Sequence, residues 1–308
     1  MFWPEGYLLT TKENQEALAS LSKLRETIAA QTICEARVTL CDSGHNLWVD
    51  LPCCKGMIPR SQGAVGIDDG SVRDIALISR VGRPVCFTVQ AIATDENGQP
   101  MALLSRKEAQ TRCRNEYLQQ LLPGDVIPAQ ITHLEPFGAF CDVGCGISSL
   151  IPIDCISVSR IFHPADRFHV GQSVNVVVRG IDQDGKLHLT HKELLGTWQE
   201  NAAQFHVGET VTGIIRTVES YGSFVELTPN LAGLAEPKAN LQPGQHAAVF
   251  IKSMIPEKMK VKLIVVDAFD CQTDQPPLHY YFTRDHMDAW QYSPAECQKQ
   301  IASYFPQP

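Results

Sequence analysis

One eight-residue pattern occurs twice in this chain, and it constrains the fold more than any other feature. Residues 136–143 (PFGAFCDV) return as residues 220–227 (SYGSFVEL), 84 positions later. Further along, Gly171 matches Gly244 only 73 positions later, because the later copy lacks most of the loop at 153–170. A repeat of this kind indicates that the chain is built from copies of one small structural unit.

Within each copy, apolar residues alternate with polar ones, which is the pattern of half-buried β-strands. The inward-facing positions of the earlier copy are expected to be Ile127, Ala129, Ile131, Ala139, Cys141, Val143, Val174, Val176, Val178, Leu187 and Leu189. The positions expected to face outward are Phe140 and Asp142, with Phe224 and Glu226 at the matching sites of the later copy. Since a small lone sheet would leave two unpaired edges, these short strands favour closed barrels.

We therefore expect a mainly β protein, made of tandem five-stranded barrels of the oligonucleotide-binding (OB) type and joined by short α-helices. The expected segments are an N-terminal helical segment at 1–32, a degenerate first barrel at 33–109, a linker helix at 110–122, a second barrel at 123–193, a linker helix at 194–207, a third barrel at 208–266 and an acidic tail with a short helix at 267–308. Helical or helix-capping patterns start at Thr10, at Arg106, at about Lys192 and at Ser293.

The formal net charge of −8 is a mild argument against nucleic-acid binding, which usually selects a basic surface. The charge is unevenly distributed, however. The second barrel has five basic and eight acidic residues, the third has six and five, and the tail has two and six. The third barrel contains a local basic cluster of Lys252, Lys258, Lys260 and Lys262, although for Lys258 alone a solvated surface position is the favoured interpretation.

The cellular compartment is expected to be the cytoplasm. Nothing at the N-terminus resembles a secretory signal, and no apolar stretch approaches the roughly 18 residues of a membrane span. The eleven cysteines are odd in number and several lie in apolar strands, so we expect free thiols in a reducing environment. The fragments that suit a zinc site best lack the spacing of paired zinc knuckles, and they are Cys53-Cys54, Cys141 with Cys145, and His163 with His169. We expect no metal, no cofactor and no membrane partner.

A set of motifs runs through the second unit: Gly124-Asp125-Val126, Phe137-Gly138-Ala139-Phe140, Val176-Val177-Val178, Asp182, Gly185-Lys186 and Leu189-Thr190-His191-Lys192. With these motifs the unit resembles the S-one RNA-binding domain, a family named for a ribosomal protein of the bacterial small subunit. Residues 208–266 are similar to another copy, and residues 33–109 to a degenerate one. The resemblance implies an OB fold that binds single-stranded RNA, in a short three-repeat relative of that ribosomal protein.

The resemblance also implies an RNA-facing surface. In the family it consists of two aromatics around a Phe-Gly-x-Phe turn, a His on the third strand, an Asp ending the fourth strand and a basic residue entering the fifth. The second barrel supplies Phe137, Phe140, Asp182 and Lys186, with Pro152 at the His position. The third supplies Tyr221, Phe224 and Lys260, with Glu236 and Pro256 at the His and Asp positions. The first has Pro59 at the His position and no aromatic turn, so it is expected to be structural.

The chemistry of these side chains supports the same surface. An unpaired base can cover an outward Phe140 or Phe224 by stacking, which is worth roughly 1–3 kcal/mol per base. Basic residues expected on adjacent strands could follow a phosphate backbone, and they are Arg216, Lys252 and Lys262. For Phe137 and Tyr221 the alternative is that the rings fill the barrel interior, although the neighbouring glycines can bend both outward.

Enzymatic activity is not expected, because the chain lacks a nucleophile elbow, a phosphate loop, a dinucleotide fingerprint and a zinc-protease motif. We expect a protein that holds single-stranded RNA, such as mRNA, with little sequence specificity at the small ribosomal subunit. The third barrel should carry most of the affinity, because its aromatic pair coincides with net positive charge. The alternatives are a protein-interaction module, which the acidic net charge favours, and an accessory subunit of an RNA-processing complex. No small-molecule substrate is expected.

Overall fold

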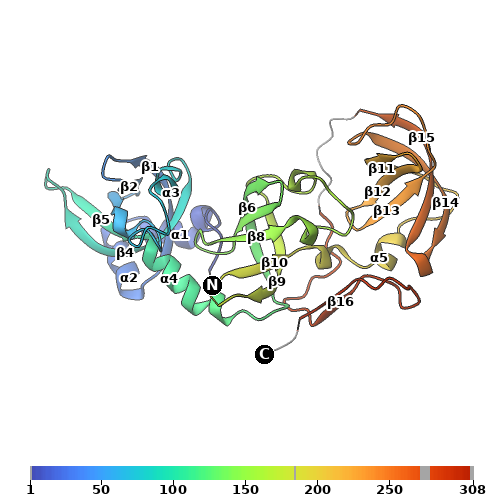
Figure 1. Cartoon of the computed structure of the whole chain (residues 1–308). Coiled ribbons are helices and arrows are strands. Elements are labelled where there is room, and N and C mark those ends of the chain that lie inside the picture. The colour runs from blue at the N-terminus through green and yellow to red at the C-terminus, as the bar shows by residue number, and fades with distance from the viewer. Residues whose placement is uncertain (1, 184, 271–277, 306–308) are drawn as a thin grey trace. The chain divides into compact units, whose positions relative to one another are not determined.

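The computed structural model describes residues 2–183, 185–270 and 278–305, and this part contains three closed five-stranded β-barrels (Figure 1). The first consists of β1 Ile33–Cys41, β2 Leu47–Asp50, β3 Lys55–Ile58, β4 Pro84–Thr94 and β5 Pro100–Ser105. The second consists of β6 Val126–Glu135, β7 Gly138–Asp142, β8 Ser148–Pro152, β9 Ser173–Ile181 and β10 Leu187–Thr190. The third consists of β11 Thr210–Glu219, β12 Gly222–Thr228, β13 Leu231–Ala235, β14 His246–Ile255 and β15 Lys260–Phe269. The expected fold class is confirmed.

All three barrels share one strand order. The first strand pairs with the second and the fourth, and the ring closes through a parallel pairing of the third strand with the fifth. This parallel pairing aligns Met57 with Leu103, Leu150 with His188, and Leu234 with Lys262. Closure leaves no unpaired strand edge, which is why such short strands form a stable unit.

Short helices lie before the first barrel, between the barrels and in loops within them. The α-helices are α1 Lys12–Leu18, α2 Leu21–Ala30, α3 Ile75–Ile78, α4 Arg106–Glu116 and α5 Trp198–Ala202. The 3-10 turns are η1 Leu8–Thr10, η2 Arg60–Gln62, η3 Leu118–Gln120, η4 Ile153–Cys155, η5 Pro164–Asp166, η6 Lys192–Leu195 and η7 Pro256–Lys258. At the N-terminus the helix cap is Thr11 rather than Thr10: its side chain accepts a hydrogen bond from the Asn14 backbone N–H.

The linker helix expected at 194–207 is much shorter in the structure. Gly196 interrupts it with a left-handed φ of +84°, and α5 starts only at Trp198. A Cβ at Gly196 would lie 2.6 Å from the Tyr281 ring, so the break also requires a residue without a side chain.

The prediction of a C-terminal helix after Ser293 was wrong. The chain instead forms a two-stranded antiparallel sheet of β16 Ala289–Gln291 and β17 Ala302–Tyr304. The Ser293 hydroxyl does accept a backbone hydrogen bond, but from Ile301 N at 2.8 Å, across the hairpin rather than within a helix. The parts of the expected tail at 271–277 and 306–308 lie outside the described residues.

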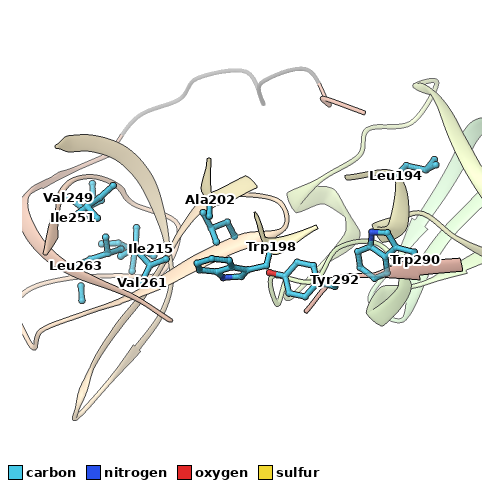
Figure 2. Packing of buried hydrophobic residues seen from close by; sticks show 14 of the residues in the cluster. Leu194, Trp198, Ala202, Ile215, Val249, Ile251, Val261, Leu263, Trp290 and Tyr292 are labelled. Carbon is cyan, nitrogen blue, oxygen red and sulfur yellow. The ribbon is translucent and has the colours of Figure 1, made fainter. Parts of the chain in front are cut away.

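Residues of the tail share one buried apolar cluster with the core of the third barrel. Figure 2 shows Trp198 of α5 beside Tyr292 of the tail, with the barrel residues Val249 and Leu263 in the same buried cluster. The Trp198 backbone N–H donates to the Tyr292 carbonyl at 3.0 Å. The Met287 backbone N–H also donates to the Gly124 carbonyl at 2.9 Å, so the tail is a structural part of the second unit rather than of one barrel.

The chain divides into two compact units. The first contains Met1–Leu121 together with Pro128–Gln130 and Asp142–Ser148, and the second contains Leu122–Ile127, Ile131–Cys141 and Ser149–Pro308. In the described residues, no helix is both long and apolar enough to cross a membrane.

Candidate nucleic-acid interface

A row of side chains crosses the third barrel from strand to strand. In the backbone register Thr217 of β11 lies opposite Phe224 of β12, Phe224 lies opposite Leu234 of β13, and Leu234 lies beside Lys262 of β15. Phe224 alternates along its strand with the buried Val225, so its ring points away from the core, and 37% of its surface is exposed. Alternation on four strands thus brings an aromatic ring and a lysine onto one outer face.

Tyr221 extends this face at the start of β12. Its side chain is 61% exposed, and its ring meets that of Phe224 edge to face with centroids 6.4 Å apart. Gly222 between them has a φ of +146°, and a Cβ there would lie 2.3 Å from the Ala235 carbonyl oxygen. The glycine is therefore required for the bend that turns both rings outward, and the alternative that Tyr221 fills the barrel is excluded.

Three lysines lie on the two strands β14 and β15, close to this face. Lys260 and Lys262 are exposed on β15 and alternate with the buried Val261 and Leu263. Lys252 lies in a bulge of β14 and forms an exposed ion pair with Glu236, with Nζ and Oε1 2.7 Å apart. The three ammonium groups face solvent on neighbouring strands.

The second barrel carries a similar aromatic group. Phe137 is 56% exposed, and its ring meets that of the half-buried Phe140 edge to face with centroids 6.0 Å apart. The Thr132 hydroxyl donates to the Phe140 carbonyl at 3.2 Å, which ties this strand position to β6. Lys186 is exposed, and its backbone N–H donates to the Asp182 carboxylate at 2.8 Å. The structure thus puts the rings of Phe137 and Phe140 together on the outer surface, and it puts Asp182 and Lys186 between β9 and β10.

Two exposed histidines on this face were missed at the level of sequence. His133 of β6 lies with its ring centroid 6.3 Å from that of Phe140, and His188 of β10 lies beside Leu150 and 3.9 Å from the Asp182 carboxylate. Alternation could not reveal His133, because it has the same parity as the inward Ala129 and Ile131, yet its side chain is exposed. His188 lies beside the third strand, where Pro152 replaces the family's histidine.

Arg216 is not on the surface. Its guanidinium is buried between two carboxylates, with Nε 2.8 Å from Glu226 Oε2 and Nη1 3.1 Å from Asp166 Oδ1. Burial opposes its charge, but the hydrogen bonds and charge of Glu226 outweigh that effect and raise the pKa of Arg216 above its ordinary value. The guanidinium is therefore part of a buried ionic cluster and does not belong to the interface.

Asp142 and Glu226 lie on the outer side of their strands, as expected, but both side chains are buried. Glu226 is buried by the same ionic cluster, which further includes Arg167. Asp142 is buried in the first unit, where its carboxylate accepts hydrogen bonds from the backbone N–H groups of Glu5, Gly144 and Gly146. Strand alternation places these side chains on the outer surface, but neighbouring segments cover that surface.

No group of three or more His, Cys, Asp or Glu side chains within residues 2–183, 185–270 and 278–305 is arranged to hold a metal ion.

Comparison with known proteins agrees with the barrel architecture. Residues 121–192 match the family described as the S1 (S-one) RNA binding domain. The small ribosomal subunit protein bS1 of Staphylococcus aureus (strain COL) is 30% identical over 278 residues, which cover 84% of this chain and 68% of that protein. The same protein of Rhodopseudomonas palustris is 28% identical over 231 residues, covering 71% of this chain and 38% of the relative.

Solved structures are less similar. A multidomain protein with nucleic acid binding domains from Streptococcus pneumoniae matches 79% of this chain, and 75% of that chain is covered, at 11% identity and a TM-score of 0.26. The relationship thus rests on the sequence matches, which extend over most of the chain and include the second barrel's aromatic turn. On this evidence the chain belongs to the family of small ribosomal subunit protein bS1.

Proposed function

We propose that this chain binds single-stranded RNA with little sequence specificity and acts in translation at the small ribosomal subunit. The observation that carries the proposal is the outward aromatic pair of the third barrel, Tyr221 and Phe224, with Lys260 and Lys262 exposed on the nearby strand β15. Exposed rings on a β-barrel offer stacking surfaces that any unpaired base can use, and adjacent lysines attract the phosphate backbone.

The geometry favours unpaired over paired RNA. In a duplex the faces of the bases are covered by their neighbours, and the readable groove is wide and shallow. The exposed rings of the second and third barrels can therefore stack on unpaired bases, but not on bases inside a duplex. Relatives named as proteins of the small ribosomal subunit support the assignment to translation, and a role at the ribosome implies a cytoplasmic location. The role is holding RNA rather than chemical catalysis.

The first prediction concerns the form of RNA. The full chain should bind an unstructured oligouridylate of about 30 nucleotides more tightly than a blunt RNA duplex of equal length, because only the single strand exposes base faces. Fluorescence anisotropy with end-labelled RNA measures both affinities. Equal affinity for the oligouridylate and the duplex would refute the proposal.

A second prediction separates stacking from charge in the third barrel. Phe224→Ala should weaken single-strand binding by roughly 1–3 kcal/mol without changing its salt dependence. Lys262→Ala should weaken it less and make the slope of log K against log salt shallower by about 0.7. The matched control is Lys12→Ala, which removes an exposed lysine of α1 and should change neither quantity.

The outcome also decides which barrel dominates. Loss of binding from Phe140→Ala but not from Phe224→Ala would move the main site to the second barrel, and it would show that positive charge was the wrong criterion. A large fall in stability from Phe224→Ala with RNA affinity preserved would mean that the ring belongs to the core.

The link to the ribosome has its own test. The chain should co-sediment with small ribosomal subunits in a low-salt lysate, and nuclease treatment should release it if RNA is the bridge. Co-sedimentation that survives nuclease would point to a protein contact instead, and absence from the small-subunit fraction would refute the ribosomal part of the proposal.

A further inference from the structure

The first barrel has the same cross-strand row as the third, although its sequence lacks the aromatic turn. In β1 and β2 the pair Leu40 and Trp48 follows directly after a register shift, as the pair Thr217 and Phe224 does in β11 and β12. Trp48 then lies opposite Met57 of β3, just as Phe224 lies opposite Leu234 of β13. Trp48 therefore occupies the position of Phe224.

A hydrogen bond gives the same alignment with the second barrel. The Thr39 hydroxyl donates to the Trp48 carbonyl at 3.2 Å, and the Thr132 hydroxyl donates to the Phe140 carbonyl at 3.2 Å. Two independent features, strand register and this side-chain contact, thus place Trp48 at the aromatic position of both other barrels.

The indole faces away from the barrel core. Its strand neighbours Leu47 and Val49 are fully buried in the core cluster of the first barrel, whereas Trp48 lies outside that cluster and is half-buried. Leu40 beside it is 53% exposed. This outer face is not part of the packing that stabilises the barrel.

The ring is also held in one orientation. The Trp48 indole N–H donates to the Asp42 carboxylate at 2.9 Å, and that carboxylate also accepts from the backbone N–H groups of Gly44 and Asn46 at 2.9 Å each. These hydrogen bonds, that of Trp48 foremost, lower the pKa of Asp42 to about 2, so the acceptor stays ionised. A fixed ring loses less conformational freedom when a ligand stacks on it.

We infer that Trp48 is the base-stacking residue of the first barrel, and that its ligand is an unpaired nucleobase of single-stranded RNA. This inference extends the proposed function to a barrel that lacks the family's aromatic motif. The row around Trp48 also differs in chemistry: Met57 is followed by Leu103 where the third barrel has Lys262. The first barrel's contribution should therefore come from stacking and apolar contact, with little dependence on salt.

The test uses the full chain and an oligouridylate of about 30 nucleotides, long enough for several barrels at about 4–16 nucleotides each. Of the four tryptophans, Trp198 and Trp290 are buried, and Trp3 is stacked on Tyr7 with ring centroids 4.0 Å apart. Because the aromatic faces of the second and third barrels contain no tryptophan, RNA should quench the emission of Trp48. In Trp48→Phe this quench should disappear, while binding is largely retained through the smaller ring.

Affinity provides the second readout. Trp48→Ala should weaken binding roughly 5-fold or more, which is the lower end of one stacked base, and the ratio to wild type should not change with salt. Circular dichroism checks that the variant is folded, and Tyr304→Ala, which removes an exposed ring on β17, should bind like wild type.

The inference is overturned if the RNA-induced quench is the same in wild type and Trp48→Phe, or if folded Trp48→Ala binds as tightly as wild type. Either result leaves the proposed function intact as long as Phe224→Ala still weakens binding. If wild type does not bind the oligouridylate at all, the proposed function fails first.

Discussion

Replacing Glu226 by alanine is expected to lower the free energy of unfolding of the second unit by about 3–5 kcal/mol. The side chain is only 5% exposed, and its carboxylate lies between the guanidinium groups of Arg216 and Arg167. Removing it would leave two buried positive charges close to each other, with Asp166 as the nearest remaining carboxylate of the cluster. An uncompensated buried charge is among the most destabilising changes in a folded protein.

The chain offers a matched control on the same barrel. Glu236 forms an ion pair with Lys252 at 2.7 Å, but these side chains are 60% and 54% exposed. Because water screens exposed charges, Glu236→Ala should change the free energy of unfolding by only about 0–1 kcal/mol. Urea denaturation of the full chain, followed by circular dichroism, measures both variants. If Glu226→Ala and Glu236→Ala lower the free energy of unfolding by similar amounts, burial does not determine how much the Glu226 cluster contributes to stability.

The cluster also bears on the RNA-binding face. Arg216 and Glu226 lie on β11 and β12, the strand pair that carries Phe224, while Asp166 and Arg167 come from the loop between β8 and β9. Ion pairs between buried charges allow few alternative arrangements of the segments that hold them. The aromatic face of the third barrel is thus built on strands that the second barrel's loop helps to fix.

Much of the fold could be predicted from alternation alone. Ala139, Cys141 and Val143 are buried, as the period of two required, and Phe140 and Phe224 point outward between buried neighbours. Alternation decides which face of a strand a side chain occupies, and in a barrel this also decides inside from outside.

Alternation does not reveal what covers the outer face. Asp142, Arg216 and Glu226 all lie on the outer side of their strands, yet segments distant in sequence bury them in hydrogen bonds and ion pairs. A charged residue in a strand is therefore weak evidence of exposure until the packing of loops is known.

Two other features depended on tertiary structure. Trp48 could not be aligned with Phe224 from sequence, because the first barrel has a longer loop in place of the Phe-Gly turn and the match rests on backbone register. The residues after Ser293 have a helix-capping pattern, but hairpin hydrogen bonds to Ile301 override it. Local propensity is a weak prior where long-range pairing is available.

His191 should make the second unit lose stability in mild acid. Its ring is fully buried, and burial, assisted by the nearby charge of Arg167, lowers its pKa to about 4. Nδ1 must donate to the Ile156 carbonyl at 2.9 Å, since a carbonyl can only accept, so Nε2 is the unprotonated nitrogen that accepts from the Tyr280 hydroxyl at 3.2 Å. Protonation would turn this acceptor into a donor, so the Tyr280 hydroxyl, which already accepts from the Asn175 backbone N–H, could no longer donate to it.

The direction of the pH effect follows from the two pKa values. In the unfolded chain a histidine takes up its proton near pH ~6.5, well above the value of about 4 in the folded protein. The stabilising contribution is therefore complete above pH ~6.5 and is lost as the pH falls toward 4, by about 3 kcal/mol in all. Other groups titrate in the same range, so the informative quantity is the difference between wild type and a variant that cannot titrate.

His191→Asn keeps an amide donor near the Ile156 carbonyl and removes the titration. The variant is expected to be less stable than wild type at pH 7.5, but to lose less stability between pH 7.5 and pH 4.5, so that the gap narrows by about 2–3 kcal/mol. The control variant is His206→Asn, at a site where the histidine is 75% exposed. If the His191→Asn and wild-type unfolding midpoints in urea instead fall in parallel, the buried imidazole does not stay neutral in the folded protein, and the hydrogen-bond directions assigned to Ile156 and Tyr280 are wrong.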